Sequence, residues 1–132
     1  MSQDKKVRIE SDLLGSREIP ADALYGVQTL RGVENFPISH FHLNEYPLFI
    51  KGLAITKMGA AAANHELGLL SDELYNAIMQ ACDEVAEGKH DKEFPVDMIQ
   101  GGAGTTTNMN ANEVIANRAL QIMGYECGDF KH

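Results

Sequence analysis

Hydrophobic residues recur at helical spacing along most of the chain, and four stretches of this kind predict four helices. The first lies within residues 20–37, with Asp22 as its candidate N-cap. The second covers residues 47–67, begins at a proline and is rich in alanine and glycine. Because small residues surround this second helix on all sides, we expect other helices to contact it from several directions.

The two remaining helices have clear boundaries. Ser71 is a suitable N-cap for a third helix, which Gly88 ends. One face of this helix carries Leu74, Ile78, Cys82 and Val85. The last helix follows the glycine-rich residues 101–104 and is stopped by Gly124. These patterns predict a mainly α fold class.

The N-terminal segment has a different pattern. Residues 7–19 mix β-branched and polar side chains around a turn signal at Gly15, which predicts a short extended segment or hairpin. A length of 132 residues suits one compact domain, and the sequence has no internal repeat. We therefore expect a single domain in which residues 1–20 form an extended arm and residues 21–132 are helical.

Composition and charge narrow the classes of function. Hydrophobic residues make up 44% of the chain, which is enough for a core, and the formal net charge is -8. An acidic chain without basic patches is not expected to bind nucleic acid or anionic membranes. The start of the chain has no apolar run typical of a signal peptide, and the two cysteines form no CxxC motif. We expect a cytoplasmic protein with reduced thiols.

The most unusual stretch is GGAGTTTNMNANE, which begins at Gly101. A nucleotide phosphate loop requires a lysine after Gly104, and a dinucleotide fingerprint requires a glycine where Thr107 stands, so both are excluded. Two interpretations stay open. The glycines and a threonine at a helix start can hold a small dianion through backbone N–H groups. Alternatively, Thr105 or Thr106 is an ordinary N-cap and the glycines only form the turn.

The asparagines of this stretch favour the first interpretation. Asn108 and Asn112 are separated by one helical turn and share a face, where amides are otherwise unfavourable inside a helix. We expect them to belong to a buried polar network next to the loop. Elsewhere, His40 and His42 lie in a predicted loop without further ligands, and His65-Glu66 lacks the second histidine of a zinc motif. No metal site is expected.

Three ordered motifs resemble one known family. GGAGTTTNMNANEVIANRAL, the upstream run REIPADALYGVQTLRGVENFPIS and the intervening FPVDMIQ are similar to the N-terminal region of the aspartase/fumarase superfamily. The resemblance covers nearly the whole chain. Within the superfamily, Ala103 and Thr106 resemble the aspartase branch, the aspartate ammonia-lyases, more than the class II fumarases.

The resemblance implies a reaction, a location and a set of residues. The reaction is the reversible elimination of ammonia from L-aspartate to give fumarate, performed in the cytoplasm by a homotetramer without a cofactor. Thr105 would hydrogen-bond the dicarboxylate substrate, and Ala103 and Gly104 would shape the pocket through their backbone. Asn108 and Asn112 would support the loop.

The resemblance also implies that this chain supplies no catalytic residue. The family's active site combines three separated regions, and the regions that carry the Ser/Thr-Asn-Asp pattern and the catalytic serine are absent from the 132 residues. We therefore expect the isolated chain to be inactive. The alternatives are a class II fumarase-like domain and a noncatalytic carboxylate-binding or assembly module.

Overall fold

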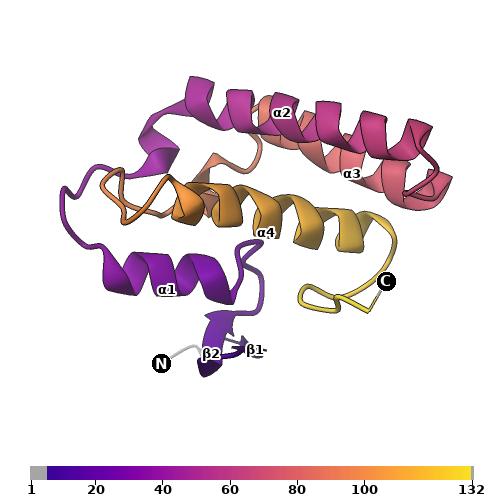
Figure 1. Ribbon diagram of the computed structural model, residues 1–132. Helices are drawn as coiled ribbons and strands as arrows, with labels where there is room; N and C mark the ends of the chain where they lie inside the picture. Colours follow the sequence, from indigo (N-terminus) through magenta and orange to yellow (C-terminus); the bar gives the residue numbers. More distant parts are fainter. Residues whose placement is uncertain (1–5, 132) are drawn as a thin grey trace.

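The computed structural model describes residues 6–131, and the mainly α fold class is confirmed (Figure 1). The elements are β1 (Val7–Asp12), β2 (Gly15–Pro20), α1 (Val27–Asn35), α2 (Pro47–Glu66), α3 (Asp72–Ala86) and α4 (Thr105–Ile122). Short 3-10 turns at Leu43–Glu45 and Asp91–Glu93 lie in the connections. None of the helices within the described residues is both long and apolar enough to cross a bilayer.

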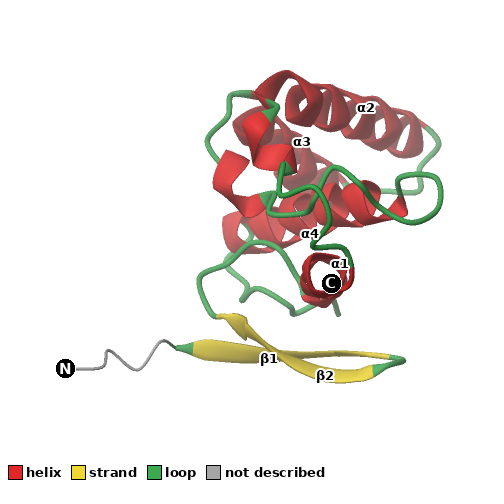
Figure 2. Cartoon of the chain, turned by 90° about the vertical axis from the view of Figure 1, so that its left-hand side faces the viewer, coloured by secondary structure: helices red, strands yellow, loops and turns green. Residues whose placement is uncertain are grey.

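β1 and β2 form the hairpin that the sequence predicts. The strands are antiparallel, with Val7 opposite Pro20 and Asp12 opposite Gly15. The hairpin lies beneath the helices, on the side away from α2 (Figure 2). Ile19 is fully buried and packs with Val27 of α1, which anchors the hairpin to the helical part. Residues 1–5 of the expected arm lie outside the described residues.

α4 lies at the centre of the fold. α1 packs on one side of it, while α3 and, at fewer positions, α2 pack on the other (Figure 1). The largest fully buried apolar side chains come from β2, α2, α3, α4 and the connections between the helices: Phe94, Ile19, Leu43, Ile50, Val85, Val96 and Val114. Burying one such side chain contributes about 1.5–3 kcal/mol to the stability of the fold. Most of these side chains belong to one cluster that includes Val114 of α4, so the core forms around this helix.

The expectation that α2 is contacted on several sides is wrong. Its buried residues are Ile50, Ala54 and Ala61, all on the face toward α3 and α4. Leu48 and Ile55 on the same helix are 83% and 54% exposed. α4 is the buried helix instead. Sequence reasoning missed this because several buried positions of α4 carry polar side chains: Thr107, Asn110, Glu113 and Asn117.

Most helix ends follow the local signals. Pro47 is the first residue of α2, and the Ser71 hydroxyl accepts a hydrogen bond from the Leu74 N–H at 3.3 Å. Gly124 adopts a left-handed φ of 86° just after α4. Asp22 is not an N-cap, however, because α1 begins five residues later with Gly26 at the N-cap position. The reason lies in distant residues that bind the start of α1.

The chain that leads to the glycine loop is held by a buried carboxylate. Asp97 accepts hydrogen bonds from the N–H groups of Ser39 and His40, both at 2.8 Å, and from the Ser39 hydroxyl at 2.7 Å. Burial alone would raise the pKa of Asp97. The Ser39 hydroxyl and the surrounding backbone N–H groups, including that of Ile99, outweigh burial and hold this pKa well below its usual value. Asp97 therefore joins residues 38–40 to the segment that precedes the loop.

Candidate carboxylate site at the start of helix α4

The glycine loop forms a tight turn directly before α4. Gly102 and Gly104 have φ values of 74° and 81°, which residues with a Cβ adopt only with strain. Gly104 is the N-cap residue, and Thr105 is the first residue of the helix. The interpretation of Thr105 or Thr106 as the N-cap is therefore wrong. The three residues predicted to bind substrate, Ala103, Gly104 and Thr105, are consecutive at the N-terminus of the helix.

This helix end is open to solvent. Ala103, Gly104 and Thr105 are exposed, and within residues 6–131 the N–H groups of Thr105 and Thr106 donate no hydrogen bond. The first backbone bond of the helix runs from the Asn108 N–H to the Gly104 carbonyl at 3.1 Å. Unpaired N–H groups and the positive end of a helix dipole together favour an anion. The geometry therefore supports a carboxylate at this position.

Gln100 fixes the position of the loop relative to the helix. Its side-chain carbonyl accepts from the Thr107 N–H at 3.0 Å, and its amide nitrogen donates to the Thr107 hydroxyl at 2.6 Å. The same nitrogen donates to the Asp97 carbonyl at 2.9 Å. Sequence reasoning missed Gln100, because it lies four residues before the N-cap Gly104, where the preferences for helix starts give no signal.

α1 approaches the loop closely from one side. The Phe36 ring lies where a side chain at Gly101 would extend, and the Thr106 methyl group occupies the place of a Cβ at Gly32. Between α1, the hairpin turn and α4 is a hollow of about 170 Å³. Its wall includes Thr105 and Thr106 from α4, and Arg31 from α1. The hollow is next to the free N–H groups.

Arg31 is a second feature that sequence reasoning did not single out. Its guanidinium donates to both carboxylate oxygens of Asp12 at 2.6 and 2.7 Å. The hydrogen bonds from Arg31 lower the pKa of Asp12 from 3.8 to about 2, so the pair stays charged at neutral pH. Arg31 thus places a cation in the wall of the hollow while its charge is balanced by the hairpin.

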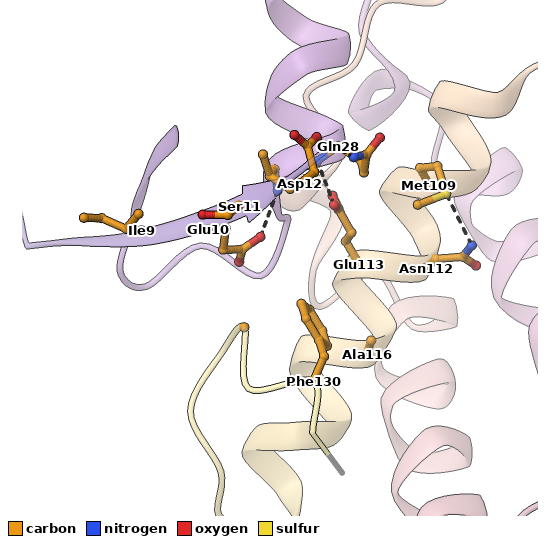
Figure 3. Close-up of a pocket in the computed structure, with 12 residues that line it drawn as sticks. Ile9, Glu10, Ser11, Asp12, Gln28, Met109, Asn112, Glu113, Ala116 and Phe130 are labelled. Atoms are coloured by element: carbon orange, nitrogen blue, oxygen red, sulfur yellow. Dashed lines mark hydrogen bonds between the residues drawn. The ribbon is translucent and has the colours of Figure 1, made fainter. Parts of the chain in front are cut away.

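Two carboxylates bind the start of α1. Glu113 of α4 accepts from the N–H groups of Gly26, Gln28 and Thr29 at 2.8–3.0 Å and from the Thr29 hydroxyl at 2.6 Å. Glu10 of β1 accepts from the Val27 N–H at 2.9 Å. Glu10 and Glu113 both line a cavity of about 470 Å³. Figure 3 shows Glu10 on the hairpin and Glu113 on α4 among the residues around it. These bonds hold α1, and with it Arg31 and Gly32, against α4.

The expected buried network of Asn108 and Asn112 is wrong. Asn108 is exposed and accepts a hydrogen bond from the Lys57 ammonium group at 2.6 Å. Asn112 is half-buried, and its amide nitrogen lies 3.9 Å from the Met109 sulfur. Neither side chain contacts the loop through a hydrogen bond within the described residues. The buried amides of the helix are Asn110 and Asn117, which donate to the carbonyls of Glu93 and Leu24.

The histidines and cysteines within the described residues form no metal cluster and no reactive thiol. Among residues 6–131, no three His, Cys, Asp or Glu side chains lie close enough together to hold a metal ion. His65 pairs with Asp72 at 2.7 Å and stacks on Tyr75. Both cysteines are free, and burial raises the pKa of the Cys82 thiol to about 11. A protonated, buried thiol is a poor nucleophile.

The mainly helical fold and the sequence around the open helix start both match a family of lyases. Residues 15–132 match a family described as lyase, and the chain belongs to this family, the aspartase/fumarase superfamily. Three aspartate ammonia-lyases are similar to it: those of Bacillus sp (59% identity over 94% of this chain), Pseudomonas fluorescens (53% over 100%) and Escherichia coli strain K12 (52% over 96%). The chain spans only 26–28% of the length of these relatives.

Two solved structures share the fold. The fumarate lyase:delta crystallin from Brucella melitensis superposes with a TM-score of 0.93 at 51% identity, over 96% of this chain and 29% of that one. The class II fumarase from Schistosoma mansoni superposes with a TM-score of 0.85 at 39% identity, over 93% and 26%. The helical arrangement described above is therefore that of the N-terminal region of these lyases.

Proposed function

We propose that this chain is the N-terminal part of a cytoplasmic aspartate ammonia-lyase and that its glycine loop binds a carboxylate group of the substrate. The observation that carries the proposal is the open start of α4, where Thr105 and Thr106 present free N–H groups beside exposed glycines. The identity of 52–59% to aspartate ammonia-lyases, against 39% to a class II fumarase, favours L-aspartate over malate as the substrate.

The site suits the chemistry of the proposed elimination. A base removes a proton from the carbon next to a carboxylate, and the electrons move onto that carboxylate before ammonia leaves. The extra charge is stabilised by donors that are already in position. The N–H groups of Thr105 and Thr106 and the Thr105 hydroxyl are such donors, since Gln100 and the packing of α1 fix the first turn of α4.

We further propose, from the resemblance, that the base belongs to regions of the parent enzyme outside these 132 residues. We propose that the parent enzyme is a homotetramer in which those regions complete the site, and that this chain alone does not turn over L-aspartate. Incubation of the purified chain with L-aspartate, followed by fumarate absorbance, tests the second statement. Turnover that survives repurification would contradict it.

Binding tests the proposed carboxylate site without needing turnover. Titration of the ¹⁵N-labelled chain with fumarate is expected to shift the backbone signals of residues 103–106. Thr105→Val removes one donor at nearly constant shape and is expected to weaken binding by about fivefold to tenfold. Thr56→Val, at an exposed threonine of α2 whose hydroxyl donates to the Gly52 carbonyl, is the matched control.

Two results would reject the carboxylate site. One is a set of signal shifts that excludes residues 103–106, and the other is equal affinity of the wild-type chain and the Thr105→Val variant. If no dicarboxylate binds and light scattering shows a defined oligomer, the chain is instead an assembly module.

A further inference from the structure

A second hollow, away from the glycine loop, lies between three helices. It has a volume of about 250 Å³ and is open between α2 and α4, with α3 contributing one side. Its lining residues are Lys57, Ala61 and Asn64 of α2, Leu70, Ile78 of α3, and Asn112, Ile115 and Ala116 of α4. None of the residues proposed above to bind substrate takes part.

Lys57 is the only lysine within residues 6–131 that is not exposed. It forms no ion pair with any carboxylate of the described residues, although the chain as a whole is acidic. Its ammonium group donates one hydrogen bond, to the side-chain oxygen of Asn108 at 2.6 Å. An ammonium group carries three N–H donors, so two donors remain for another acceptor.

The amides around the hollow also have unused donors. Within residues 6–131 the Asn112 amide nitrogen donates a single hydrogen bond, to the Met109 sulfur at 3.9 Å, and sulfur is a weak acceptor. The Asn64 side chain makes no hydrogen bond within the described part of the chain. Ile78 and Ile115 supply apolar walls. The site therefore combines a cation and amide donors with an apolar interior.

The charges of the lining residues favour an anionic ligand in this hollow. No aspartate or glutamate is among the lining residues of this hollow, as the structure describes it. The larger cavity beside the hairpin differs, because Glu10, Asp12 and Glu113 line it. An anion would be repelled there, whereas at Lys57 it gains a charge-assisted hydrogen bond.

We propose that the hollow between α2 and α4 binds a small monocarboxylate with a short aliphatic chain. The carboxylate accepts from the Lys57 ammonium group and the Asn112 amide, and the aliphatic chain packs on Ile78 and Ile115. This site is separate from the proposed substrate site and does not depend on it. A small ligand in a partly open pocket is expected to bind with a dissociation constant on the order of millimolar.

Titration of the whole ¹⁵N-labelled chain with sodium pentanoate, against sodium chloride at equal ionic strength, tests the proposal. Saturable shifts are expected at Lys57, Ala61 and Asn112 rather than at residues 103–106. Lys57→Gln is expected to weaken pentanoate binding by about tenfold. The matched control, Lys51→Gln, changes an exposed lysine of the same helix by the same net charge and is expected to leave binding within about twofold.

Pentan-1-ol separates the role of the charge from that of the aliphatic chain. It fits the same walls without an anion and is expected to bind more weakly than pentanoate. The proposal is overturned by equal binding of the alcohol, by equal losses in the two lysine variants, or by wild-type shifts that are absent or centred on the glycine loop. If Lys57→Gln does not fold, the signal shifts of the wild-type chain with pentanoate show by themselves whether the ligand binds in this hollow.

Discussion

Glu113 shows how one residue can determine the position of an element to which it does not belong. It lies on α4, yet its carboxylate accepts three backbone N–H groups and one hydroxyl from the start of α1. A helix start leaves several N–H groups without partners, and a carboxylate there is favoured by hydrogen bonding and by the helix dipole. Since the side chain is 8% exposed, water cannot readily replace it.

Glu113→Gln tests this arrangement. The glutamine keeps the shape but turns an NH₂ group toward N–H donors, so we expect a loss of about 2–3 kcal/mol in the free energy of unfolding. Urea denaturation measures the loss. Glu126→Gln, at an exposed position, is the control and is expected to change stability by less than about 0.5 kcal/mol. Equal effects of the two substitutions would refute the role given to Glu113.

Glu84 is expected to make the stability of the fold depend on pH. Its carboxylate accepts from the Arg118 guanidinium and from His90. The Arg118 hydrogen bonds lower the pKa of Glu84 from 4.5 to about 2. Because the folded pKa lies below the unfolded value, the pair stabilises the fold above pH 4.5, and this contribution is lost as the pH falls toward about 2.

We therefore expect Arg118→Met to flatten the acid side of the stability curve. Wild-type and variant chains would be compared by urea denaturation at several pH values within that window. Arg17→Met removes an exposed pair with Glu34 and is expected to leave the curve parallel to that of the wild type. A variant curve at Arg118 that is as steep as the wild-type curve would contradict this assignment.

At the scale of elements, sequence reasoning predicted those features that local signals determine. The hairpin, the start of α2 at Pro47, the cap at Ser71 and the stop at Gly124 all follow from nearby residues. The start of α1 could not be predicted in this way. Its N–H groups are bound by Glu113 and Glu10, from residues up to 87 positions away, so no cap is needed next to the helix.

The candidate site was predictable to a similar degree. The glycine loop was singled out because glycines before a helix start have a direct physical meaning. The role of Thr105 came from the resemblance to the aspartase/fumarase superfamily and stays a prediction. The contribution of Arg31 depends on how α1 packs on α4, which the sequence does not display. The misplacement of the amide network has another cause. Spacing shows that Asn108 and Asn112 share a face, but not that this face lies at the edge between α4 and α2, where Asn108 is exposed and Asn112 is half-buried.

A glycine-to-alanine substitution is expected to change stability in opposite directions at the α1–α4 contact and on the open face of α2. Gly32→Ala would force a Cβ into the Thr106 methyl group, and we expect a loss of about 1–3 kcal/mol. Gly59→Ala, in α2, meets no atom within 4 Å and is expected to gain about 0.5–1 kcal/mol from helix propensity. Adding Thr106→Ser to Gly32→Ala should recover most of the loss, which a double-mutant cycle measures.

At the scale of the whole molecule, the described residues expose large apolar side chains at several places, of which the hairpin turn and the start of α2 are the most exposed. Leu13 and Leu14 form the hairpin turn and are 105% and 77% exposed, and Leu48 near the start of α2 is 83% exposed. Exposed apolar surface favours association, and association of this kind is not screened by salt. We therefore expect the chain to self-associate.

Sedimentation velocity over a range of protein concentrations would detect this association as a rising average mass at both low and high salt. The double substitution Leu14→Ser and Leu48→Ser is expected to shift the rise to higher concentration. Gln80→Ser, at an exposed polar position of α3, serves as the control. A wild-type chain that stays monomeric throughout would exclude the prediction.

The bonds of Glu113 have a consequence for insertions and deletions. Thr105 opens α4, and Glu113 reaches α1 from the same helix two turns later. An α-helix turns by about 100° per residue, so adding or removing a single residue between these positions would rotate one of them away from its partners. The length of this segment is thus more constrained than its composition, and we expect it to tolerate substitutions at its exposed positions far better than any change in its residue count.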